Sequence, residues 1–196
     1  MRTALRLALL LLLIVGAAAA ITREQAKSYR RRVLDKQVVA GAGAHAVIGT
    51  ARNVPHEWGR GPVGFTERVG SSLGQHIVKG TIGMGVGAWH HENLHYERSN
   101  LHGTLPRMEY AVKSTFIVPK TNRPGHKTVA LGRVSGNLGA GLISRAWQPA
   151  TSAGVGAGLA SGGIGLGADV GVNMAREFWP RKHKGVSREH NVHRAG

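Results

Sequence analysis

Glycines spaced four residues apart are the feature of this sequence that most constrains its fold. Residues four apart share one face of an α-helix, so such a series predicts a smooth groove into which a second helix packs closely. The longest run consists of Gly154, Gly158 and Gly162, continued directly by Gly163, Gly167 and Gly171. Gly83 and Gly87 repeat the spacing earlier in the chain. We expect these eight glycines to form helix-packing faces.

Valine, isoleucine and leucine are interleaved with these glycines, which favours helices over the alternative of a flexible glycine-rich loop. Each glycine costs about 0.8–1 kcal/mol relative to alanine in a helix interior, so tight helix–helix contact or a membrane setting must offset that cost. The sequence therefore predicts a mainly α-helical fold, a bundle of glycine-zipper helix pairs. A Pro124-Gly125 turn between two short extended runs adds a possible β-hairpin near residues 116–130.

The first twenty residues have the pattern of a secretory signal peptide. Arg2 and Arg6 precede the apolar run Leu7 to Val15, and small residues end at Ala20. The chain has no cysteine, which excludes disulfides, thiol catalysis and a lipid-modified cysteine. An exported chain without disulfides suits a bacterial periplasm or cell envelope better than a eukaryotic extracellular space.

The remaining chain divides into three parts. Residues 21–36 predict a basic N-terminal helix, residues 37–180 a single glycine-rich helical domain, and residues 181–196 a disordered basic tail. Within the domain, residues 37–89 and 127–179 have a similar layout, which suggests a degenerate repeat.

Four tryptophans lie at the ends of the glycine-rich segments: Trp58, Trp89, Trp147 and Trp179. Tryptophan is enriched where membrane meets water, so these side chains are candidate interfacial anchors. Residues 150–168 carry no charge and would form about 28 Å of helix. Their hydrophobicity is weak, and we expect association with a membrane or oligomerisation in preference to a true span.

Residues 91–95, His-Glu-Asn-Leu-His, match the H-E-x-x-H pattern of zinc hydrolases. On a helix, His91 and His95 would bind zinc and Glu92 would activate water. The surrounding residues lack the usual third ligand, because His102 lies seven residues after His95 where six are expected. A zinc hydrolase is therefore only an alternative reading, and we infer no cofactor and no catalytic residue.

Removal of the signal peptide leaves 24 of the 26 cations against ten carboxylates, a net charge of +14. Export makes nucleic acid an unexpected partner. Self-association or another envelope protein fits the glycine faces, while anionic lipid or an acidic glycan fits the charge. A solvated basic face is the plain alternative.

Several motifs between residues 56 and 182 resemble a family of uncharacterised, secreted, glycine-rich bacterial envelope proteins. The resemblance rests on W-G…R-x-G, H-E-x-x-x-Y, G-N…G-x-I-S and E-F-W-P, the last at residues 177–180. In that family pattern His91, Glu92 and Tyr96 match, whereas His95 does not, so the paired histidines are peculiar to this chain. The resemblance implies an envelope location and assigns no activity.

Together these features predict an exported structural or interaction protein that packs or oligomerises through glycine-zipper helices, associated with a membrane. A zinc-dependent hydrolase and a cationic membrane-active protein are the alternatives.

Overall fold

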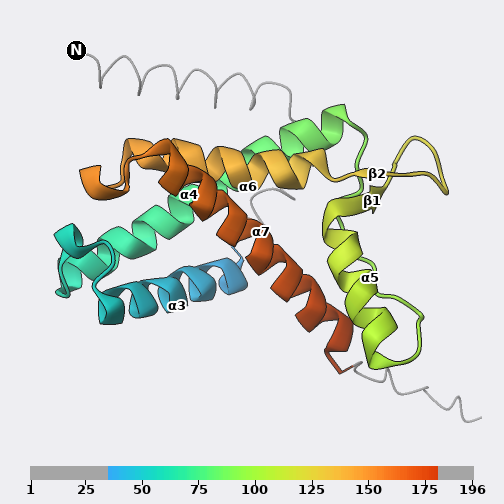
Figure 1. The fold of residues 1–196 in the computed structure, drawn as a ribbon, viewed down its shortest axis with the longest axis horizontal. Helices are drawn as coiled ribbons and strands as arrows, with labels where there is room; N and C mark the ends of the chain where they lie inside the picture. Colours follow the sequence, from blue (N-terminus) through green and yellow to red (C-terminus); the bar gives the residue numbers. More distant parts are fainter. Residues whose placement is uncertain (1–34, 181–196) are drawn as a thin grey trace, which may run out of the picture.

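A computed structural model describes residues 35–180, which form five α-helices and one two-stranded antiparallel sheet (Figure 1). The elements are α3 (Lys36–Arg52), α4 (Pro62–Trp89), α5 (Thr104–Phe116), β1 (Ile117–Pro119), β2 (Lys127–Val129), α6 (Leu131–Ile143) and α7 (Val155–Phe178). The predicted helical fold and the hairpin near residues 116–130 are confirmed. The predicted signal peptide (1–20) and basic tail (181–196) lie outside the described residues, as does the basic helix (21–36) apart from its last two residues.

Local sequence explains where the two longest helices begin and end. Pro62 is the first residue of α4, a position where the missing N–H costs nothing and the fixed φ suits a helix. The helix stops before His91, whose φ of 57° is left-handed. At the other end of the fold, Trp179 is extended because it precedes Pro180, which terminates α7 as the sequence predicts.

The helices pack in series. Helix α3 contacts α4, α4 contacts α6, α6 contacts α7, and α7 contacts α5. Figure 1 shows α7 crossing the other long helices obliquely to reach α5. Since most of these helices have one or two main neighbours, each keeps a broad face directed away from the others.

Each half of the predicted repeat contains a shorter helix, a connection with 3-10 turns and a longer helix. In the first half α3 leads through His56–Trp58 to α4, which ends at Trp89. In the second half α6 leads through Ser144–Ala146 and Ala150–Ser152 to α7, which ends one residue before Trp179. The two halves meet where α4 packs against α6.

Small and polar residues occupy the interior. The buried apolar side chains among residues 35–180 belong to five alanines, Val118 and Tyr96. No Leu, Ile, Met, Phe or Trp of this part of the chain is buried. The interior therefore contains few large apolar side chains, and the stability of the fold depends on contact between helix backbones and on polar interactions.

Candidate functional site

The crossing of α4 and α6 brings two backbones into contact through glycine. A β-carbon added at Gly132 would lie 2.5 Å from the carbonyl oxygen of Gly83, and one added at Gly136 would lie 2.7 Å from that of Lys79. Gly87 lies beside Gly132 at the same crossing. These distances leave no room for a side chain, so glycine is required on α6 by the approach of the α4 backbone.

The crossing of α6 and α7 is built the same way on another face of α6. A β-carbon at Gly162 would lie 2.8 Å from the α-carbon of Leu138, and one at Gly158 would lie 3.1 Å from the carbonyl oxygen of Gly141. Helix α6 therefore presents one small-residue face to α4 and a second to α7.

The other glycines of the predicted α7 series lie in open space. Within the described chain, a β-carbon would meet nothing within 4 Å at Gly154, Gly163, Gly167 or Gly171. Gly154 precedes the first turn of α7. For Gly163, Gly167 and Gly171 the reason is helical geometry, because this second series starts one residue later and one residue rotates the face by about 100°. The single contact face predicted from Gly154 to Gly171 is thus two faces, with one packed on α6 and one outward.

The inward face of α7 changes from glycine to polar side chains toward its C-terminus. Asp169, Asn173 and Glu177 follow at four-residue intervals, and each reaches a different neighbour. Asp169 accepts hydrogen bonds from Lys79 on α4 (2.7 Å) and Asn137 on α6 (2.8 Å). Asn173 donates to the hydroxyl of Thr115 on α5 (2.9 Å). These contacts fix the position of α7 along its length.

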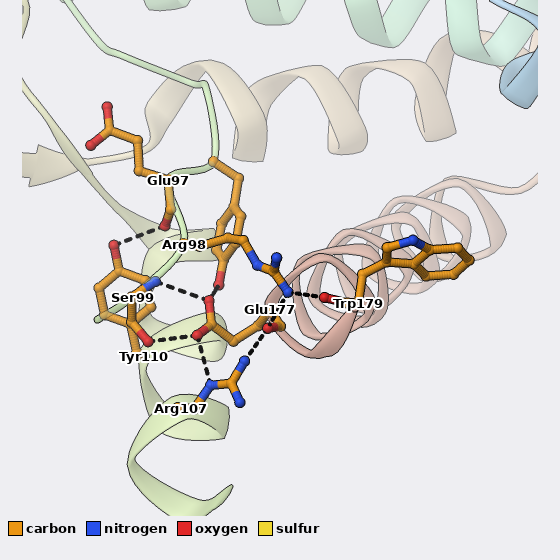
Figure 2. A network of polar contacts seen from close by, with 8 residues as sticks. Glu97, Arg98, Ser99, Arg107, Tyr110, Glu177 and Trp179 are labelled. Atoms are coloured by element: carbon orange, nitrogen blue, oxygen red, sulfur yellow. Dashed lines mark hydrogen bonds and ion pairs between the residues drawn. The ribbon is translucent and has the colours of Figure 1, made fainter. Parts of the chain in front are cut away.

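The Glu177 carboxylate lies at the centre of a network of hydrogen bonds at the end of α7 (Figure 2). This fully buried carboxylate accepts from Tyr96 Oη (2.6 Å), Ser99 N (3.1 Å), Ser99 Oγ (2.5 Å) and Arg107 Nε (3.1 Å). The guanidinium groups of Arg98 and Arg107 also donate to the backbone carbonyl of Glu177. Cations at these last carbonyls favour the C-terminus of α7.

Hydrogen bonding keeps Glu177 ionised, and burial keeps Tyr96 protonated. Burial alone would raise the pKa of Glu177, but hydrogen bonds from Ser99, Tyr96 and Arg107 outweigh it and lower the pKa to about 2. Burial, together with the adjacent Glu177 carboxylate, raises the pKa of Tyr96. Neither Glu177 nor Tyr96 changes its protonation state near neutral pH. This suits a structural role, in which the pair holds the end of α7 in place, better than a role in proton transfer.

Glu92, the candidate catalytic base, caps helix α6. Its buried carboxylate accepts from the backbone N–H of Leu131 (2.8 Å) and Gly132 (2.9 Å) and contacts His90 Nδ1 at 2.8 Å. These N–H groups are the free donors of the first helical turn, where a negative charge is favourable.

The helix that zinc binding would require is absent from residues 91–95. Helix α4 ends at Trp89, His91 is left-handed, and Glu92 forms a β-bridge with Lys120. Both His91 and His95 are exposed. Among residues 35–180, no three side chains of the metal-ligating types are grouped. The H-E-x-x-H spacing therefore does not produce the arrangement of a zinc hydrolase here.

The four tryptophans have two different environments. The Trp147 indole donates to Ser71 Oγ (3.1 Å) and its ring packs against Gly74, which ties the α6–α7 connection to α4. Trp58 lies under the guanidinium of Arg68, with 5.8 Å from the ring centroid to Cζ. Trp89 and Trp179 are largely exposed. Trp147 nevertheless remains 38 % exposed, against 77 % for Trp89 and 70 % for Trp179.

Arg68 organises the connection between α3 and α4. Although its side chain is almost fully buried, it donates to the carbonyl oxygens of Val54 (2.9 Å), Pro55 (2.8 Å) and Gly59 (2.8 Å). This is the arginine of the W-G…R-x-G motif, and its role is to satisfy carbonyls that would otherwise be buried without a partner.

A cleft of about 580 Å³ lies beside the α4–α6 crossing. Its walls include Lys79, Glu92, Arg133 and Asp169. Lys79 pairs with Asp169, Glu92 caps α6, and Arg133 donates to the carbonyls of Leu94, Ser114 and Thr115. These four charged groups are thus engaged with one another or with the backbone, and His95 and Arg176 line the same cleft.

Helix α7 combines a polar inner face with an apolar outer one. It is the one helix among residues 35–180 that is long and apolar enough, by length and composition alone, to cross a membrane. Val155, Leu159, Ile164 and Val172 are exposed on it. Within residues 35–180, polar groups such as Glu92 and Glu177 are thus buried while large apolar side chains are exposed.

Neither the protein-family models, the curated proteins nor the solved structures contain a match to this chain.

Proposed function

We propose that this chain is an exported structural protein of the bacterial envelope that associates with a membrane and assembles through its glycine-rich helices. The partner is a second copy of the chain or another envelope protein. The proposal extends the resemblance of residues 56–182 to secreted glycine-rich envelope proteins. It assigns no reaction, since the polar groups best placed for chemistry, Glu92 and Glu177, are engaged in holding helices together.

The supporting observation is that large apolar side chains are exposed while polar ones such as Glu92 and Glu177 are buried. Contiguous apolar surface beyond a few hundred Å² on a soluble monomer marks a site of contact with protein or membrane. Exposed large apolar residues occur on every helix of the described chain, and α7 carries them beside Gly163, Gly167 and Gly171. A second helix can approach this outer face as closely as α6 approaches the inner one, where Gly158 and Gly162 lie.

The absence of cysteine provides a clean test. Ile164 on the outer face of α7 and Leu105 on α5 are both 75 % exposed, so single cysteines there are equally accessible. We expect Ile164→Cys to form disulfide-linked dimers in membranes of producing cells and Leu105→Cys to remain monomeric. The unsubstituted chain should remain in those membranes after a carbonate wash.

A third variant separates assembly from folding. A side chain at Gly167 meets nothing in the described chain, so adding Gly167→Leu to Ile164→Cys should preserve the helical circular dichroism and abolish the cross-link. Equal cross-linking of the two single-cysteine variants, or release of the chain by carbonate, would contradict the proposal. Leakage of dye from anionic vesicles would instead support the cationic membrane-active alternative.

A further inference from the structure

The loop of the β1–β2 hairpin projects away from the helices to one side of Figure 1. The two strands pair antiparallel, with Ile117 opposite Val129, Val118 opposite Thr128 and Pro119 opposite Lys127. The loop between the strands, residues 120–126, is exposed at Arg123 and His126. The base of this loop is fastened to the end of α4, because Thr121 N–H donates to the His91 carbonyl (2.8 Å).

The hairpin has one buried face and one exposed apolar face. Val118 points inward and is buried. Alternate residues of a strand point to opposite sides, so Ile117 and Pro119 share the outer face with their partners Val129 and Lys127. Ile117 and Val129 are 46 % and 54 % exposed, which leaves an apolar cross-strand pair in contact with solvent.

The Asp, Glu, Lys and Arg side chains of the hairpin itself, residues 117–129, are all cationic. The sequence contains no Asp or Glu from residue 110 to residue 168. Lys120, Arg123 and Lys127 lie in or beside the loop, and the last two are exposed. Ile117 and Val129 are thus bordered by cations, with no acidic residue nearby in the sequence. This arrangement complements a surface with anionic groups at its exterior and an apolar layer below them.

We propose that the outer face of the hairpin docks on an anionic lipid bilayer. Ile117 and Val129 enter the boundary between headgroups and acyl chains, while Arg123 and Lys127 bind headgroup phosphates. An acidic glycan would use the cations alone and leave the apolar pair in water, which is why lipid fits better. Trp89, exposed two residues before His91, lies at the end of α4 next to the hairpin, where an indole suits the same boundary. The inference rests on the proposed membrane association and adds its lipid chemistry.

The test measures partition of the exported, purified chain onto vesicles of phosphatidylglycerol and phosphatidylcholine. Each cation at an anionic surface contributes about fivefold in partition, so Arg123→Gln with Lys127→Gln should weaken binding to phosphatidylglycerol about 30-fold. The matched control, Arg52→Gln with Arg60→Gln, removes the same charge from exposed positions at the end of α3 and in the connection to α4, and should change binding less than threefold.

A second pair of variants tests the apolar contact. Ile117→Ser with Val129→Ser should weaken partition by about tenfold. Val47→Ser with Ile48→Ser is the control, because these α3 residues are 59 % and 58 % exposed and should have no effect. The helical circular dichroism of every variant should match that of the parent chain.

Equal effects of hairpin and control substitutions would overturn the docking face while leaving the Ile164 cross-link, and with it the proposed assembly, intact. If the parent chain is retained on a heparin column and does not bind vesicles, and only the charge substitutions reduce that retention, the lipid docking face would be overturned in favour of a glycan surface. Retention of the cross-link together with a specific loss of vesicle binding in both hairpin pairs would support it.

Discussion

Replacing Glu177 by glutamine tests whether α7 is held by a buried charge. All four contacts to the carboxylate are donors, two on each oxygen. A glutamine amide in either orientation places its NH₂ group against two of them. The hydroxyls of Tyr96 and Ser99 can rotate to accept, but the Ser99 backbone N–H and Arg107 Nε cannot. One fixed donor therefore loses its acceptor whichever way the amide turns.

The magnitude follows from the proton affinity of the carboxyl. The pKa falls from 4.5 to about 2, and each tenfold change in affinity corresponds to about 1.4 kcal/mol, so the charged form stabilises the fold by roughly 3 kcal/mol. Loss of one partner from a buried charged pair costs about 3–5 kcal/mol, which agrees. We expect Glu177→Gln to lower the free energy of unfolding by about 3 kcal/mol.

Urea unfolding followed by circular dichroism measures this difference. With a slope of about 1.5 kcal/mol/M, the midpoint of Glu177→Gln should fall by about 2 M. Glu109→Gln is the matched control, since Glu109 forms an exposed pair with Lys113 on α5 and should leave the midpoint unchanged. A midpoint for Glu177→Gln within about 0.3 M of the parent chain would refute the reasoning.

The same charge predicts a pH dependence with a definite sign. The pKa of Glu177 is lower in the folded chain than in the unfolded one, so its contribution is present above pH 4.5 and disappears as the pH falls toward 2. The difference in stability between the parent chain and Glu177→Gln should shrink across this interval. A difference that stays constant from pH 6 to pH 2 would show that the carboxylate charge is not the source.

Five further substitutions address the rest of the site. Gly136→Ala should lower stability by about 1–3 kcal/mol in urea unfolding because its methyl group meets the α4 backbone, whereas Gly167→Ala should raise it by up to about 1 kcal/mol. Glu92→Gln should lower stability by about 1 kcal/mol through a weaker α6 cap. Arg68→Lys should lower it by about 2 kcal/mol, since a single ammonium nitrogen cannot reach the three carbonyls that Nε, Nη1 and Nη2 of the guanidinium contact separately. His95→Ala should leave the zinc content of the purified chain unchanged, and loss of stoichiometric zinc would restore the hydrolase alternative.

The sequence predicted the helical class, the hairpin and the end of α7 because these depend on nearby residues. Pro180 terminates its helix wherever the chain folds, and the Pro124-Gly125 turn marks the hairpin loop. The four-residue spacing also identified Gly158 and Gly162, which lie at a crossing. The offset to Gly163 was visible in the sequence, and counting 100° per residue would have divided the series into two faces.

The polar contacts could not be predicted in the same way. Asp169, Asn173 and Glu177 have a legible four-residue period, but their partners lie between 32 and 90 residues away in the sequence. The H-E-x-x-H motif places Glu92 on a helix only in the zinc-hydrolase alternative, and the left-handed His91 that precludes this helix has no strong local signal. Arg68 belonged to a noted motif, yet only the path of residues 54–59 reveals which carbonyls it binds.

The position of Glu177 near the end of the described chain has a consequence for biogenesis. Synthesis runs from the N-terminus, so Tyr96, Ser99 and Arg107 are made 70 to 81 residues before the carboxylate that joins them. Until the last turn of α7 is made, the cationic and hydroxyl groups around this position lack the carboxylate, and α5 lacks its main partner helix. A nascent or prematurely terminated chain without the final residues of α7 therefore lacks the Glu177 carboxylate. We expect such a chain to be degraded by proteases more readily than the full one.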